Sequence, residues 1–161
     1  RGTHMGRNIL AVIAGYFAMA IILFGVFTAV YLAMGAERAF NESSYDVSTL
    51  WIIVSVIVGF FAALVGGAVC AIVSKRSRGA TLSLMALVLV LGILSGVMAM
   101  GKEAPTGDDA VRGPETSNTD AMMNAQQPGW ILVANPIIGL FGVMTGAMML
   151  GGWSSKKPDM E

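Results

Sequence analysis

The sequence is poor in charged residues. Only 12% of its 161 residues are charged, against about a quarter in a typical soluble domain, and its mean hydropathy is +0.71. A chain this apolar does not remain disordered. Its ten basic and ten acidic residues cancel, so it also lacks the basic surplus of a nucleic-acid-binding protein. These deficits predict an integral membrane protein.

Metal-binding side chains are equally scarce, because the chain has one histidine, His4, and one cysteine, Cys70. Residues 1–5 resemble the remnant of a cleaved expression tag ending at the natural start Met5, which leaves 6–161 as a single domain. His4 then belongs to the tag. One cysteine permits neither an intrachain disulfide nor a Cys-based zinc site. We therefore expect no metal, haem or other cofactor.

Four uncharged apolar runs make up most of the chain. They cover residues 9–34, 50–73, 80–100 and 130–153. Each exceeds the roughly 20 residues that a helix needs to cross the hydrocarbon core of a bilayer. Backbone polar groups must be satisfied within such a segment in lipid, so the runs must be helices. The sequence predicts an all-α, polytopic bundle of four transmembrane helices.

The distribution of charge predicts the orientation of this bundle. Seven basic residues lie on the side of the two termini and three lie on the opposite side. This asymmetry places both termini in the cytoplasm. Eight of the ten acidic residues lie on the outer side. The zero net charge therefore separates into a positive inner face and a negative outer face.

The connections differ in character. The short turn 74–79 makes the second and third helices an antiparallel hairpin. Ser48 is a candidate N-cap for the second helix. The outer segment 101–129 contains several Pro and Gly residues, so we expect most of it to be mobile, with one helical turn capped at Thr119 and Asp120.

Small residues follow one face of each predicted helix. Transmembrane helices associate by close packing at such residues, because lipid tails are as apolar as Leu. The first helix carries Ala11, Ala14, Ala18, Gly25 and Thr28. The candidates on the other three are Gly59, Ala63, Gly66, Gly92, Gly96, Gly139, Gly142 and Gly146. The pattern is typical of packing within one chain, and it also fits association of Gly92/Gly96 or Gly142/Gly146 with a second copy or a partner protein.

Asn135 and Pro136 interrupt the last apolar run. The pair matches an N-cap followed by the first helical position, which would start the helix at Pro136. Alternatively the helix starts at Trp130, and Pro136 kinks it by removing the donor for the carbonyl of Leu132. The kink is favoured. Asn135 is then a polar contact within the apolar layer, to another helix, to the freed carbonyl or to a ligand.

The apolar runs contain no Asp, Glu, Lys, Arg or His. Proton relays, voltage sensors and ion-coupled transporters rely on such residues, and no base stands near a Ser or Thr hydroxyl to activate it. We expect no catalytic residue and no enzymatic activity. The basic cluster Lys75, Arg76 and Arg78 fits a role in topology, and it would attract anionic headgroups by about 1 kcal/mol per basic residue.

With the spans placed, the segments NILA (8–11), AGY (14–16) and GGAVCA (66–71) resemble segments of small four-helix bacterial inner-membrane proteins, which form uncharacterised families. The resemblance implies a bacterial plasma membrane and carries over no functional residue.

The sequence therefore favours a non-enzymatic structural or accessory membrane protein that associates with itself or a partner through small-residue helix faces. The alternative is a pore or carrier for an uncharged or apolar solute or lipid, formed by the bundle or by an oligomer. Helices packed through Gly and Ala leave little lumen, which favours the accessory role.

Overall fold

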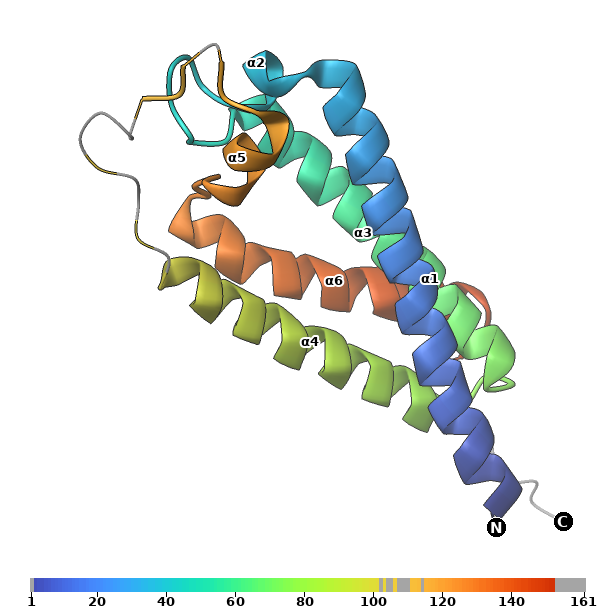
Figure 1. The fold of residues 1–161 in the computed structure, drawn as a ribbon. Coiled ribbons are helices and arrows are strands. Elements are labelled where there is room, and N and C mark those ends of the chain that lie inside the picture. The colour runs from blue at the N-terminus through green and yellow to red at the C-terminus, as the bar shows by residue number, and fades with distance from the viewer. Residues whose placement is uncertain (1, 102, 104–105, 107–110, 114, 153–161) are drawn as a thin grey trace, which may run out of the picture.

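The four apolar runs form helices in the computed structural model, which describes residues 2–101, 103, 106, 111–113 and 115–152. They are α1 (Gly2–Met34), α3 (Thr49–Val73), α4 (Arg78–Met100) and α6 (Gly129–Met149), as Figure 1 shows. Each is long and apolar enough to cross a membrane. Two short helices, α2 (Ala36–Ala39) and α5 (Asn118–Met123), lie in the connections. The predicted all-α architecture with four long helices is confirmed.

Local chemistry explains where the helices begin and end. The Ser48 hydroxyl accepts a hydrogen bond from the Trp51 N–H at 3.1 Å, which confirms Ser48 as the N-cap of α3. The predicted end of the last helix at residue 153 is wrong, because α6 stops at Met149. Gly151 follows with a left-handed φ of 72°, and this conformation ends a helix.

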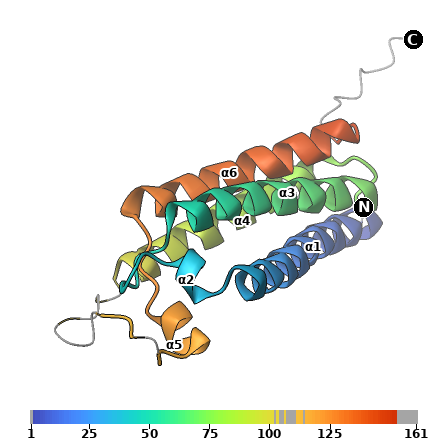
Figure 2. The same cartoon turned by 90° about the horizontal axis from the view of Figure 1, so that it is seen from above.

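The long helices are packed around α3. α3 packs against both α1 and α6, and α6 packs against α4, so that α3 lies between α6 and α1 in Figure 2. The helices lie closest near the turn between α3 and α4, and the first turns of α1 project beyond them (Figure 1). We call this the turn end. They diverge towards α2 and α5, which we call the cap end.

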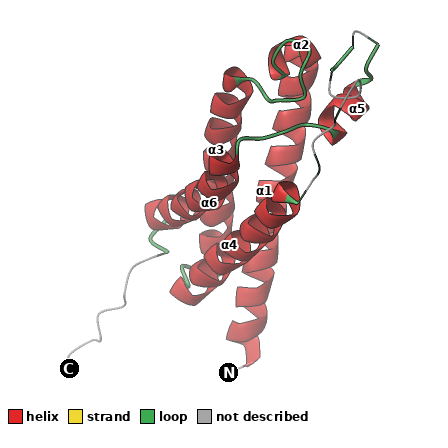
Figure 3. Cartoon of the chain, turned by 90° about the vertical axis from the view of Figure 1, so that its left-hand side faces the viewer, coloured by secondary structure: helices red, strands yellow, loops and turns green. Residues whose placement is uncertain are grey.

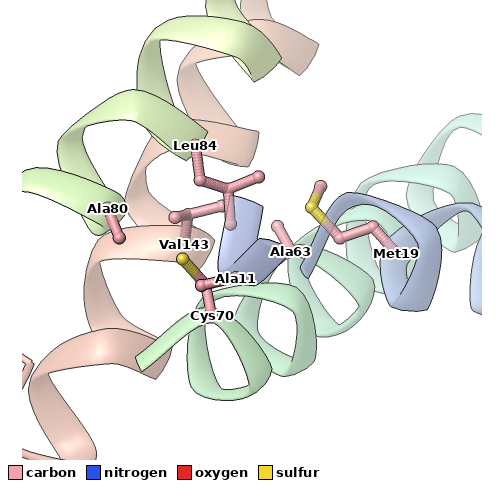
Figure 4. Close-up of a cluster of buried hydrophobic side chains, with 7 residues drawn as sticks. All are labelled: Ala11, Met19, Ala63, Cys70, Ala80, Leu84 and Val143. Atoms are coloured by element: carbon pink, nitrogen blue, oxygen red, sulfur yellow. The ribbon is translucent and has the colours of Figure 1, made fainter. Parts of the chain in front are cut away.

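Mainly small buried side chains fill the core near the turn end. All four long helices contribute to it (Figure 4), through Ala11, Met19, Ala63, Cys70, Ala80, Leu84 and Val143. Side chains as short as Ala and Cys fill a core only where helix backbones approach closely. Close packing here follows directly from the small residues of the sequence.

A second cluster holds the cap end together. It combines the end of α1 with α2, the following loop and α5 (Figure 3), through Tyr31, Ala39, Phe40, Val47 and Ala121. Backbone hydrogen bonds from Gln126 N–H to Tyr45 O at 2.8 Å and from Val47 N–H to Gln126 O at 3.0 Å join the two outer connections.

The segment predicted to be mobile, 101–129, is therefore partly ordered. Its residues 118–123 form α5, and the cap is Ser117 rather than Thr119, since the Ser117 hydroxyl accepts from the Asp120 N–H at 3.1 Å. Contacts with the first outer connection, which the sequence does not reveal, hold this part of the segment in place.

Candidate functional site

Four glycines bring α1, α3 and α6 into backbone contact. A β-carbon added at Gly146 would overlap Leu64 O, and one added at Gly67 would overlap Val143 O. At Gly142 it would lie 2.6 Å from Ala63 Cβ, and at Gly66 it would lie 2.8 Å from Gly15 O and overlap Met19. Only hydrogen fits at these positions. The faces of Gly66 and Gly142/Gly146 are therefore filled by helices of the same chain.

Three more candidates lie between α4 and α6. A β-carbon at Gly92 would lie 2.8 Å from Pro136 Cγ, one at Gly96 3.3 Å from Leu132 O, and one at Gly139 3.0 Å from Val88 Cγ1. The Gly92/Gly96 face is therefore also occupied within the chain. A second copy would have to displace α6 to reach it.

Some of the small residues expected to pack against another helix have no close contact with one. A β-carbon at Gly59 or at Gly25 would meet nothing within 4 Å. On α1, Gly25 and Thr28 are exposed although the preceding members of the same line, Ala11, Ala14 and Ala18, face inward to differing degrees. The line of small residues on α1 thus leaves the core as the helices diverge towards the cap end.

Pro136 lies inside α6, which begins at Gly129 as the kinked alternative requires, and not at Pro136. Pro136 is buried against Gly92, and it cannot donate a hydrogen bond to the carbonyl of Leu132, which faces Gly96. Asn135 is exposed instead. Among the described residues, Asn135 makes no hydrogen bond to another helix or to the carbonyl of Leu132, so neither polar contact expected within the bundle is formed.

A shallow apolar groove runs beside this contact. It has a volume of about 210 Å³ and lies between α4 and α6 towards the cap end. It is lined by Leu89, Ile93, Gly96, Val97, Met100, Leu132, Val133, Pro136 and Ile137. Apart from the backbone carbonyl of Leu132, its described lining offers no polar group, so it suits a hydrocarbon chain.

The basic turn at the other end has an unusual backbone. Arg76 N–H donates to Ala71 O at 2.7 Å and Lys75 N–H to Ile72 O at 3.1 Å, the two hydrogen bonds of a Schellman motif. Glycine is usual at the left-handed position of this motif, but here Lys75 and Arg76 have φ of 55° and 66°. Each left-handed non-glycine residue costs about 1–3 kcal/mol.

The end of α6 lies beside this turn and uses the same motif. Gly152 N–H donates to Ala147 O at 2.8 Å and Gly151 N–H to Met148 O at 2.9 Å, with φ of 72° at Gly151. Two neighbouring helix ends therefore share one hydrogen-bond pattern. One has glycine at the left-handed position, and the other has lysine followed by arginine.

A cavity of about 450 Å³ lies between these two helix ends. Its lining combines two cations with apolar side chains, namely Ala71, Ile72, Lys75, Arg76 and Leu150. The side chain of Arg76 extends towards α6, where its Cδ and Nε lie 3.5 Å from the position of a β-carbon on Gly151. Arg78, the third member of the predicted cluster, is the first residue of α4 and does not line the cavity.

Several hydroxyl groups near the helices donate to the backbone. The hydroxyls of Ser55, Ser74 and Thr81 donate to Trp51 O, Ala71 O and Ser77 O at 2.7, 3.3 and 3.4 Å. Among the described residues no three His, Cys, Asp or Glu side chains gather as a metal site would require. Cys70 is buried in the core.

Lys75 and Arg76 are identifiable from the sequence as basic residues of the turn. The backbone that distinguishes them from Arg78 is not, because lysine and arginine give no signal for a left-handed conformation. Gly92 and Pro136 are each recognisable in the sequence, but their contact with each other is not. In comparisons with family models, curated proteins and solved structures, nothing matches this chain.

Proposed function

We propose that this chain is a small non-enzymatic integral membrane protein with a structural or accessory role. The observation that supports this best is the closure of the bundle at its glycines. Backbone contacts at Gly66, Gly67, Gly142 and Gly146 bring α1, α3 and α6 together near the turn end. A solute path through the middle of one bundle would have to separate these backbones.

The proposed location is a bacterial inner membrane, crossed four times, with both termini in the cytoplasm. The basic turn supports this orientation, because Lys75 and Arg76 lie at the turn end, whereas the described acidic residues lie in the two connections at the cap end. The cap end then faces outward as an ordered, acidic surface to which a partner protein has access.

Association with a second copy or another membrane protein would use surfaces that the chain does not fill itself. One such line of small residues lies on the part of α1 nearest the cap end, where Gly25, Ala29 and Ala33 are exposed at intervals of four residues. Gly25→Leu is expected to reduce association and leave the fold intact. Gly142→Leu is expected to unfold the bundle, because it collides with Ala63 and Phe60. A detergent-corrected mass that stays monomeric for the unaltered protein would exclude self-association.

Solute flux separates the accessory role from a pore. The protein is reconstituted in liposomes, and glycerol-driven swelling is compared with protein-free liposomes and with a glycerol channel. The closed bundle predicts a swelling rate equal to that of protein-free liposomes. A rate several-fold faster would contradict the accessory role and favour an oligomeric pore.

The second candidate function is binding or carriage of a lipid or apolar solute, which the groove between α4 and α6 favours. A photoreactive fatty acid should then label α4 and α6. Ile93→Trp fills the groove and should reduce labelling. Val90→Trp is the matched control, because Val90 is exposed on α4 outside the groove. Equal labelling of both variants would remove this candidate.

A further inference from the structure

The two helix ends beside the basic cavity do not need Lys75 and Arg76 as caps. The last carbonyls of α3 accept the backbone N–H groups of residues 75 and 76, and those of α6 accept from Gly151 and Gly152. Cations often stabilise helix carboxyl ends by binding such carbonyls. Here that role is already filled by the backbone, so the two cationic side chains remain available for another anion.

The backbone indicates that the side chains themselves matter at this turn. Gly151 shows that glycine serves the same motif in the same chain. Lys75 at the corresponding position of α3 is strained, as is Arg76 after it, and strained residues cluster at functional sites. What they present is two positive charges on the wall of one cavity.

No anionic partner from the chain lies near this cavity in the described structure. The segments 5–34, 49–101 and 129–152, which form the long helices and the basic turn, contain no Asp or Glu. The described acidic residues are in the connections at the cap end. Two cations on the wall of the cavity favour an anionic occupant.

The remaining lining identifies the kind of anion. Ile72 is 64% exposed at the end of α3, and Leu150 follows α6 directly. These side chains stand where two membrane-length helices end, so they meet the boundary between headgroups and hydrocarbon. A wall of cations beside a wall of apolar side chains complements a phosphate that is attached to acyl chains.

We propose that the cavity beside Lys75 and Arg76 binds the phosphate of an anionic phospholipid, with Ile72 and Leu150 against its glycerol and acyl groups. The proposal depends on the chain crossing a bilayer, and it is independent of the accessory role. It also divides the basic cluster, since Arg78 stands outside the site.

Thermal unfolding of the full chain in detergent tests the site, with phosphatidylglycerol, phosphatidylcholine of the same acyl chains, or inorganic phosphate added. Phosphatidylglycerol is expected to raise the melting temperature of the unaltered protein, and the other two probes are not. At about 1 kcal/mol per basic residue, Lys75→Gln with Arg76→Gln should weaken the lipid's apparent affinity about 30-fold. Arg78→Gln, which removes one charge outside the cavity, should weaken it much less than Arg76→Gln.

A second double variant separates binding from folding. Lys75→Gly with Arg76→Gly removes both charges and relieves the left-handed strain, so this protein should unfold at no lower temperature than the unaltered one and still lose its response to phosphatidylglycerol. A retained response would overturn the proposal. So would an equal loss in Arg78→Gln and Arg76→Gln, which would indicate a diffuse basic face, or an equal response to inorganic phosphate, which would indicate a free-anion site.

Discussion

The side chain of Arg76 lies across Gly151, with its Cδ and Nε each 3.5 Å from the position of a β-carbon on that glycine. The contact joins two helix ends that share one hydrogen-bonded motif. Backbone strain is present only in the α3 copy of the motif, where Lys75 and Arg76 occupy left-handed positions. The strained backbone of this turn therefore places two cations beside one cavity.

Opposite substitutions at the two helix ends should have opposite effects on stability. Lys75→Gly should raise the free energy of unfolding by about 1 kcal/mol, because glycine adopts φ of 55° without strain. Gly151→Ala should lower it by about 1–2 kcal/mol, because alanine is strained at φ of 72°. Unfolding by SDS in mixed micelles measures both. A destabilised Lys75→Gly variant would show that the lysine side chain supports the fold.

Glycines of the same chain should differ sharply in their tolerance of one methyl group. Gly146→Ala should destabilise the bundle by more than about 2 kcal/mol, because the methyl group would overlap Leu64 O in the backbone of α3. Gly59→Ala should be neutral or stabilise by up to about 1 kcal/mol, since nothing lies within 4 Å and alanine favours a helix. Thermal unfolding in detergent compares the pair. Equal destabilisation would mean that Gly59 is also in a close contact.

Gly92 and Pro136 should be energetically coupled. Gly92→Ala places a methyl group 2.8 Å from Pro136 Cγ, so it should destabilise the unaltered protein. Pro136→Ala removes that Cγ and restores the N–H donor for Leu132 O, so it should partly relieve the effect. A double-mutant cycle should give a coupling of about 0.5–3 kcal/mol. Strict additivity would indicate that α4 and α6 do not touch here.

The connections at the cap end should unfold locally while the long helices stay folded. Phe40 is 4% exposed and Arg112 Cζ lies 5.6 Å from the centre of its ring. Phe40→Ala should therefore accelerate proteolysis within 111–127 and leave the helical circular dichroism signal largely unchanged. Met123→Ala is the control, because Met123 is 65% exposed. Equal rates for the two variants would contradict an ordered cap centred on Phe40.

The four long helices follow from the sequence because a run of 20 apolar residues has few stable alternatives in lipid. Ser48 could be identified as an N-cap for a similarly local reason, since its hydroxyl needs only the Trp51 N–H three residues later. The predicted end of α6 is wrong because residues 150–153 are uncharged and do not interrupt the run, although Gly151 is a local signal for a left-handed helix end.

The helix that packs against each small residue cannot be predicted from the sequence, because a line of glycines has the same pattern whichever helix it contacts. Gly92 meets Pro136 and Gly142 meets Ala63, but these pairs depend on how the helices cross. The order of α5 likewise depends on contacts with a connection more than 60 residues earlier, such as the Arg112 Nε donating to Ser44 O.

A disulfide between α4 and α6 tests most directly whether the small-residue faces are filled within one chain. A β-carbon at Gly96 would lie 3.7 Å from Leu132 Cβ, close to the mean disulfide separation of about 3.8 Å. With Cys70 replaced by alanine, Gly96→Cys with Leu132→Cys should oxidise within the monomer, and Gly96→Cys alone should give no dimer on a non-reducing gel. Disulfide-linked dimers from Gly96→Cys alone would contradict the closed bundle.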